Sequence, residues 1–331
     1  MIYDVATCVG EKHIDVAIKS IRSLLLFSDA RKIFAISSAR ILDQIEKEVG
    51  QEPRIRLLDE NHLINTIDIN FIKEKFKQRI GSEERTNWYF QQFIKMSISG
   101  HPEISEYYLI WDSDTILLKP TAFFDESNRV LINPANEYHR PYFDSIERIL
   151  NIKRQVSFSF ISEHFMVKKE YMQILIQNIS ANAQPNTSWI EHIISSIDNK
   201  DLGKSGFSEY ETYGNFIALK FRNSFSLRKI KSTRYGTIFF GSKPDKYAIF
   251  SLMRSGYAFA TFESWHKISR LKAPIMNSIA RVAYIFCYLT RRYSEQLKAA
   301  NEIVRLARDS IVVRRARVKH KPHRLRNPGP T

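Results

Sequence analysis

The chain has 331 residues, 44% of them hydrophobic, and a formal net charge of +15. This composition excludes a disordered chain as the default and is ample for one large α/β domain, alone or with an extension. Two cysteines, Cys8 and Cys287, are too few for a disulfide framework or a cysteine zinc site, so both are predicted to be buried in a reducing compartment. The N-terminus has no signal-peptide pattern, and the longest apolar stretch, "IARVAYIFCYLT", is too short to span a bilayer. A cytoplasmic protein is therefore expected.

The first sixty residues alternate between strand and helix patterns. Apolar runs at 3–9, 32–38 and 54–60 have the length of strands, and apolar residues recur at helical spacing in 13–27 and 41–49. This alternation predicts an α/β fold with a mainly parallel, doubly wound sheet. Ligands of such sheets bind beyond the carboxyl ends of the strands, where Thr7 and Asp59 fall.

The remaining elements continue this mixed pattern. Helices are predicted at 70–80, 87–99, 142–150 and through 171–199, and strands at 107–115, 129–135, 156–167 and 258–266. Long helical periodicity begins beyond Pro274 and gives way to a basic, proline-containing end. Neither GxGxxG nor GxxxxGK[ST] occurs, which argues against an ordinary dinucleotide oxidoreductase or P-loop ATPase.

The stretch "YYLIWDSDTILLKP" places two carboxylates, Asp112 and Asp114, at the end of the most apolar predicted strand. Residues i and i+2 of an extended segment point the same way, so both carboxylates can face one point. Hard oxygen ligands of this kind suit Mg²⁺ or Mn²⁺, which shares its other positions with water and phosphate oxygens. The alternative is an ordinary polar turn that ends a strand.

A strand with this ending, after two to three βα units, resembles the GT-A class of glycosyltransferases, which use a DxD motif to hold a metal and the diphosphate of a nucleotide-sugar donor. The ordered set "LLDE", "NWYFQQFIKM", "YYLIWDSDTILLKP", "SFISEHFMVKKEYM" and "GFSEYETYGNF" is similar to a bacterial family of GT-A type proteins catalogued as a domain of unknown function. That family is presumed to act in polysaccharide biosynthesis. The resemblance covers about residues 1–266 and implies a GT-A fold there.

Other motifs supply candidate donor-binding and catalytic residues. Gln91 and Lys95 lie four residues apart on one helix face and are predicted to reach base, ribose or phosphate, unless that face is simply solvated. Glu163 interrupts an apolar strand that the resemblance directs toward the donor sugar, although a salt-bridged glutamate is the simpler interpretation. Glu209 and Glu211 are candidate general bases for an inverting enzyme. Alternatively, Ser208 caps a helix whose first turn contains both glutamates.

The resemblance also suggests that His266, in "FESWHK", is a third metal ligand beside Asp112 and Asp114, with Glu263 behind it. The predicted protein is thus a Mn²⁺- or Mg²⁺-dependent glycosyltransferase that moves a sugar from a nucleoside diphosphate sugar to a saccharide or lipid-linked acceptor. Two alternatives stay open: a nucleotidyltransferase acting on a sugar phosphate, and a non-catalytic saccharide- or membrane-binding module with the same fold.

The positive charge is concentrated at the C-terminal end. Residues 1–266 contain 34 Lys and Arg against 32 Asp and Glu, whereas residues 267–331 contain 16 against 3. We therefore predict a GT-A domain at 1–266, a helical extension at 267–313 and a basic tail at 314–331. The extension and tail are expected to rest on the anionic inner face of a membrane. The contact would be made by an apolar stripe of Leu297, Ala300, Val304, Ala307 and Ile311. Alternatively, this stripe docks on the body or on a partner subunit as an ordinary helix. Nucleic acid is a less favoured partner because no recognition motif accompanies the charge.

Overall fold

The computed structural model describes residues 1–64 and 68–305. Its strands are β1 (Tyr3–Cys8), β2 (Ile33–Ser37), β3 (Ile55–Asp59), β4 (Tyr107–Trp111), β5 (Thr115–Leu117), β6 (Val130–Ile132), β7 (His164–Lys168), β8 (Phe225–Leu227), β9 (Ser232–Thr233) and β10 (Phe259–Thr261). Its α-helices are α1 (Ile14–Phe27), α2 (Ala39–Val49), α3 (Ile69–Ile80), α4 (Thr86–Ser97), α5 (Arg140–Leu150), α6 (Lys169–Ala181), α7 (Trp189–Ser196), α8 (Asn199–Leu202), α9 (Glu209–Lys220), α10 (Gly236–Phe240), α11 (Lys246–Arg254), α12 (Lys272–Leu289) and α13 (Ser294–Val304).

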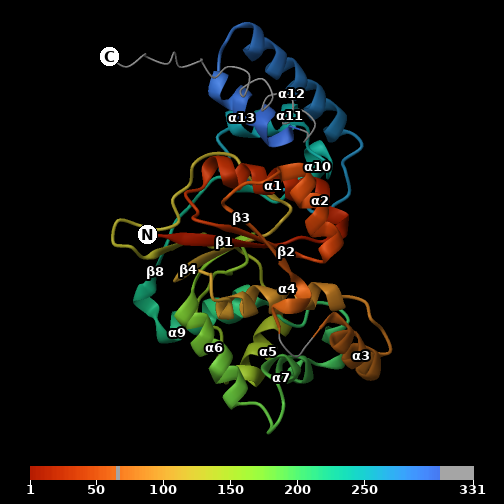
Figure 1. Ribbon diagram of the computed structural model, residues 1–331, viewed down its shortest axis with the longest axis vertical. Coiled ribbons are helices and arrows are strands. Elements are labelled where there is room, and N and C mark those ends of the chain that lie inside the picture. The colour runs from red at the N-terminus through yellow and green to blue at the C-terminus, as the bar shows by residue number, and fades with distance from the viewer. Residues whose placement is uncertain (65–67, 306–331) are drawn as a thin grey trace, which may run out of the picture.

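The main sheet has five strands in the order β3-β2-β1-β4-β7. The first four are parallel, and only β7 runs antiparallel, against β4. Helices α1 and α2 cover one face and α4 lies on the other, where α5, α6, α7 and α9 follow (Figure 1). The predicted α/β fold with a mainly parallel sheet flanked by helices is confirmed. Since the chain builds β2 and β3 on one side of β1 and β4 on the other, the switch point lies between the carboxyl ends of β1 and β4.

Two smaller sheets extend this framework. β10 lies between β5 and β9, antiparallel to β5 and parallel to β9, and β6 pairs with β8. The predicted strand 156–167 is mostly wrong, because β7 begins only at His164. Glu163, just before it, has a φ of 61° in the left-handed region, which breaks the alternation that a strand requires. The pattern failed here because apolar residues of an irregular buried segment look like those of a strand.

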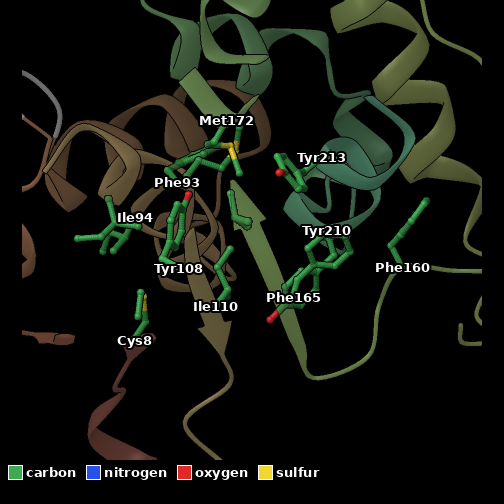
Figure 2. Packing of buried hydrophobic residues seen from close by; sticks show 14 of the residues in the cluster. Cys8, Phe93, Ile94, Tyr108, Ile110, Phe160, Phe165, Met172, Tyr210 and Tyr213 are labelled. Atoms are coloured by element: carbon green, nitrogen blue, oxygen red, sulfur yellow. The ribbon is translucent and has the colours of Figure 1, made fainter. Parts of the chain in front are cut away.

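The largest apolar cluster lies on the sheet face that carries α4 (Figure 2). Phe93 of α4 and Tyr108 of β4 belong to it, and both side chains are fully buried. In the same cluster the ring of Phe165, on β7, stacks on Tyr210 of α9 with 6.0 Å between centroids. This packing fixes the first turn of α9 against the carboxyl end of β4.

Gly214, in the middle of α9, lies against a core aromatic ring. A Cβ atom at this position would come within 2.2 Å of the Phe160 ring. We expect Gly214→Ala to lower the free energy of unfolding by roughly 1–3 kcal/mol, because overpacking outweighs the better helix propensity of alanine. Urea unfolding measures the change, with Gly100→Ala as the control, since a Cβ there meets nothing within 4 Å. Equal stability of the two variants would refute this packing argument.

The C-terminal helices dock on the body rather than standing free. Residues of α12 and α13 form a second apolar cluster with α10, α11, β5 and β10, and Val16 of α1 belongs to it as well (Figure 1). Leu297, Ala300 and Ile303 are buried in this cluster. The prediction that the stripe at Leu297, Ala300 and Val304 meets a membrane is therefore wrong for α13, and the docked-helix alternative holds. Ala307, Ile311 and the predicted tail at 314–331 lie outside the described residues.

Candidate functional site

A polar cleft of about 440 Å³ opens at the switch point of the sheet. This size lies within the ~300–1,000 Å³ typical of small-molecule sites. Cys8 and Gly10, at the end of β1, form one part of its wall, and the Asp112-Ser113-Asp114 segment after β4 forms another. Helix α4 contributes Gln91, Gln92 and Lys95, the start of α9 contributes Glu209 and Tyr210, and Glu137, Arg234, Glu263 and Trp265 come from later loops.

The Asp112-Ser113-Asp114 segment is a tight turn between β4 and β5. The Thr115 backbone N–H donates to the Asp112 carbonyl at 3.0 Å. Residues next to two neighbouring strands hold the turn in place. The Asp112 N–H donates to the carbonyl of Glu163, just before β7, at 3.0 Å, and the N–H of Phe262, just after β10, donates to the Asp114 carbonyl at 2.8 Å. Because these bonds use only backbone atoms, both aspartate side chains stay free to face the cleft. The polar-turn alternative is thus correct as a description of the backbone, and the turn also lines a cavity.

Lys95 of α4 meets Asp112 in the cleft. Its ammonium Nζ lies 2.7 Å from Oδ1 of Asp112 and 2.9 Å from Oε1 of Glu209. The Tyr210 hydroxyl donates to the same Asp112 oxygen at 3.0 Å. Nζ also lies 4.8 Å from the centroid of the Tyr210 ring, so one cation is held by two carboxylates and a π face. These carboxylates raise the pKa of Lys95 against the opposing effect of burial, so the ammonium stays charged.

The pKa of Asp114 is raised to about 7 by burial and by the carboxylates of Asp112 and Glu263. A carboxyl group whose ionisation is opposed by neighbouring anions is stabilised in its charged form by a cation. Two hard oxygen donors that face a cleft fit Mg²⁺ or Mn²⁺, provided that phosphate and water complete the coordination. Within the described residues, no group of three or more His, Cys, Asp and Glu side chains is placed to hold a metal ion.

His266 does not join the two aspartates. Its Nδ1 lies 3.1 Å from Oε2 of Glu263, within ion-pair distance but without hydrogen-bond geometry. Neither His266 Nδ1 nor Glu263 Oε2 has a hydrogen-bond partner among the described residues. His266 also packs against Trp265, with 3.9 Å between ring centroids. The three-residue ligand set predicted with His266 is therefore not assembled, because this histidine faces Glu263 instead.

The opposite wall of the cleft is built around Arg234, which sequence analysis did not identify. Its guanidinium contacts Glu163 at 2.8 Å, Glu137 at 3.0 Å and Glu263 at 3.0 Å. Burial nevertheless raises the pKa of Glu163 to about 8, although Arg234 opposes the shift. Arg234 follows the two-residue strand β9 with no periodic pattern around it, and Glu137 lies in a loop. No sequence signal therefore linked these residues.

Glu209 and Glu211, the predicted general bases, occupy different environments. Ser208 caps α9, where its hydroxyl accepts from the Glu211 N–H at 3.3 Å, as the capping alternative predicted. Glu209 points into the cleft toward Lys95. Glu211 turns away and accepts hydrogen bonds from the Ser159 hydroxyl at 2.5 Å and the Phe160 N–H at 3.2 Å. Only Glu209 is placed to act on a ligand.

The predicted donor-binding residues divide in the same way. Gln91 and Lys95 line the cleft as expected, together with Gln92. Gln92 Oε1 accepts from the Glu209 N–H at 3.1 Å, and its buried Nε2 has no hydrogen-bond partner among the described residues.

Thr7 and Asp59 are not among the cleft-lining residues. Thr7 is fully buried within β1, and Asp59 accepts from the Asn61 N–H to cap the turn after β3. The strand-end argument located the correct sheet edge but not the side chains that face the cleft. Cys8 does line it, although burial raises the pKa of its thiol to about 12, which leaves the group protonated and unreactive at neutral pH.

Several solved structures are similar to this one at low sequence identity. The galactosyltransferase LgtC, in complex with donor and acceptor sugar analogues, is 10% identical over 84% of this chain and 95% of its own, with a TM-score of 0.42. The apo form of mouse xyloside xylosyltransferase 1 is 10% identical over 79% and 97%, with a TM-score of 0.40. The apo form of the glycosyltransferase GlyE from Streptococcus pneumoniae TIGR4 is 12% identical over 87% and 64%, with a TM-score of 0.40.

No curated protein matches the sequence. A family model described as a family of unknown function, DUF6492, matches residues 11–238. This match includes the Asp112-Ser113-Asp114 turn, Lys95, Glu209 and Arg234. The chain belongs to the family of unknown function DUF6492.

Proposed function

We propose that the protein is a metal-dependent glycosyltransferase that moves a sugar from a nucleoside diphosphate sugar to a hydroxyl group of a saccharide or lipid-linked acceptor. The observation that carries this proposal is the position of the Asp112-Ser113-Asp114 turn at the switch point of the sheet, with Lys95 beside it. A cleft with a pair of hard oxygen donors and an ammonium has the charges that a diphosphate and its divalent cation require.

In this proposal the diphosphate would bind beside Lys95 and the two aspartates. Asp112 and Asp114 would hold Mn²⁺ or Mg²⁺, and a bound metal would offset negative charge on the departing diphosphate. Lys95 supplies a second positive charge and can leave Glu209 to meet a phosphate oxygen. Gln91 and Gln92 supply amide groups at the same wall, and the unpartnered Nε2 of Gln92 is a donor for a sugar, ribose or base oxygen.

Glu209 is the proposed general base. It lines the cleft within the network that contains Asp112, so an acceptor hydroxyl placed over the sugar can reach its carboxylate. When Lys95 turns to the diphosphate, Glu209 loses its ion pair and becomes a better proton acceptor. Donor binding would in this way prepare the base for the acceptor. An acceptor of the polysaccharide-precursor type fits the resemblance of the sequence motifs.

The experiment that tests this function has two stages. A panel of nucleoside diphosphate sugars is first screened by thermal shift with Mn²⁺ and with EDTA, where a ligand at 100 times its Kd adds roughly 2.7 kcal/mol of stability. The ligand that binds is then incubated with the protein and Mn²⁺, and the products are separated. We expect free nucleoside diphosphate from slow hydrolysis of the donor.

Other products would contradict the proposal. Pyrophosphate formed from a nucleoside triphosphate and a sugar phosphate would identify a nucleotidyltransferase instead. Metal-independent saccharide binding without any turnover would identify a non-catalytic module.

A further inference from the structure

Helix α12 leaves one apolar face without a partner among the described residues. Its inner face, with Ala280, Tyr284 and Cys287, is buried in the second apolar cluster. The outer face carries exposed apolar side chains at spacings of three and four residues, which is one stripe of a helix. These are Ile275, Ile279, Val282, Phe286 and Leu289, each between 55% and 75% exposed. The stripe is distinct from the one predicted on α13, which is buried.

The charge around this stripe has a single sign. Residues 264–294 contain six Lys and Arg and no Asp or Glu. At 100° per residue, Lys272 lies about 60° from the centre of the stripe on one side, and Arg281 lies about 120° from it on the other side, beyond Ile285. The Arg281 guanidinium lies over the Tyr247 ring, so Lys272 is the basic residue of α12 nearest the stripe. The 26 residues that follow the described part of the chain add eight Lys and Arg against one Asp. An apolar face on a chain segment that carries only basic charges fits a partner that is apolar inside and anionic at its surface.

We propose that the outer face of α12 docks on an anionic lipid bilayer. The apolar stripe enters the interface between headgroups and acyl chains, and Lys272 and the other basic residues of this segment meet lipid phosphates. The helix would lie in the plane of the surface, because its inner face stays packed in the second apolar cluster. None of the described helices could span a bilayer. Exposed Tyr288 and Tyr293 lie at the end of this helix and suit the interfacial zone, where aromatic rings with a polar tip collect.

A second copy of the chain is a poorer occupant. A symmetric dimer through this face would bring the basic residues of segment 264–294 of both copies, Lys272 among them, to one interface without an acidic residue of α12 to pair with them. A lipid surface instead supplies anionic headgroups across its whole area, so each basic residue can meet one.

The exposed apolar residues also continue from α12 toward the cleft. Trp265 lines the cleft and is 70% exposed, and Ile268 and Leu271, between it and α12, are 52% and 82% exposed. Docking of α12 would therefore bring the rim of the cleft toward the membrane surface. Only the use of this placement, which is access to a lipid-linked acceptor, rests on the proposed function. The docking itself needs no donor, metal or turnover.

Co-sedimentation of the full-length protein with vesicles tests the inference. We expect binding to vesicles of about 30% phosphatidylglycerol in phosphatidylcholine, at least about tenfold weaker binding to phosphatidylcholine alone, and release by salt. The double variant Val282→Asp/Phe286→Asp is expected to lower binding to the anionic vesicles by at least about tenfold, because it places carboxylates on the inserted face. Both sites are exposed, so circular dichroism and the thermal midpoint should match the wild type.

The matched control is Leu219→Asp/Leu227→Asp, which introduces the same charges at exposed leucines of α9 and β8. This control should bind the anionic vesicles like the wild type. Wild-type binding by Val282→Asp/Phe286→Asp would overturn the proposal, because the contact would then not involve α12. A wild-type dimer in light scattering that becomes a monomer in Val282→Asp/Phe286→Asp would also overturn it, in favour of a second copy as the occupant. A donor that binds normally while vesicle binding fails would reject this inference and leave the proposed function standing.

Discussion

Asp114→Asn is expected to abolish Mn²⁺-dependent nucleotide binding and, at the same time, to make the metal-free protein more stable at pH 8. The amide is nearly isosteric with the carboxylate but carries no charge, so a metal loses one of its two proposed protein ligands. The metal-free protein gains because Asp114 is forced to ionise beside Asp112 and Glu263 in a buried position. A residue that serves ligand binding thus lowers the stability of the metal-free protein.

The sign of the stability change follows from the two pKa values of Asp114. The folded pKa is about 7 and the unfolded value is 3.8, so the folded protein holds a proton that the unfolded chain releases between these values. The wild type therefore loses stability as pH rises from about 4 to 7, and the loss is complete above pH 7. Asp114→Asn removes this effect. Its advantage should be absent below pH 4 and on the order of 1–3 kcal/mol at pH 8, after allowance for partial solvent screening.

Urea unfolding of both proteins in EDTA at pH 4 and pH 8 measures this difference, and titration with Mn²⁺ and nucleoside diphosphates measures binding. Asp125→Asn is a control of opposite sign. Asp125 accepts from the Arg129 backbone N–H, which together with the side chains of Ser226 and Arg129 lowers its pKa, so its neutralisation should destabilise the protein at neutral pH. Unchanged Mn²⁺-dependent binding in Asp114→Asn would rule out the proposed metal site.

Glu209→Gln is expected to lower turnover by roughly 10²- to 10⁴-fold, which is the usual contribution of a general base. Donor affinity should stay within about threefold of wild type, because the introduced amide keeps the shape of the side chain and Lys95 keeps its contact with Asp112. Single-turnover rates of sugar transfer at saturating donor measure the effect, and equilibrium titration of the donor measures affinity separately.

Glu211→Gln is the matched control, since it makes the same change two residues along the same helix. Glu211 accepts hydrogen bonds from Ser159, Phe160 and Asn215 in a buried site. The NH₂ group of a glutamine in its place would face these donors and could not accept from them. We expect a loss of roughly 1–3 kcal/mol in stability with wild-type turnover per folded molecule. If Glu209→Gln retains wild-type turnover, the base lies elsewhere or the enzyme retains configuration and needs none.

The sequence predicted most of the sheet because its early elements are local patterns. The strands β1 and β2 are buried throughout, β3 is a half-buried apolar run, and the helices α1 and α2 each bury a periodic set of residues, so the local pattern is a sufficient signal. Asp112 was identifiable for a related reason, since a charged pair after a fully apolar strand is costly without a partner. Lys95 was identifiable because it lies four residues after Gln91 on one face of the predicted helix.

Other parts depend on contacts between segments that are far apart in the chain. The contact of Arg234 with Glu163 joins residues separated by 71 positions in irregular segments, and no periodic rule applies to either. The roles of Glu209 and Glu211 differ only because the first turn of α9 faces Lys95 on one side and Ser159 on the other. The face of α12 that is exposed could not be predicted either, because the helix is apolar on both sides and only docking decides which side is covered.

Arg234 gives the cleft wall a mechanical property. Its guanidinium forms ion pairs with three separate segments. These are the loop that contains Glu137, Glu163 just before β7, and Glu263 just after β10. None of these segments can withdraw from the cleft unless it gives up its ion pair, and Arg234 cannot turn toward a ligand without releasing at least one of them. The motions of the three segments are therefore coupled through Arg234. We expect this side of the cleft to open in one concerted movement and not by independent fluctuations of three loops.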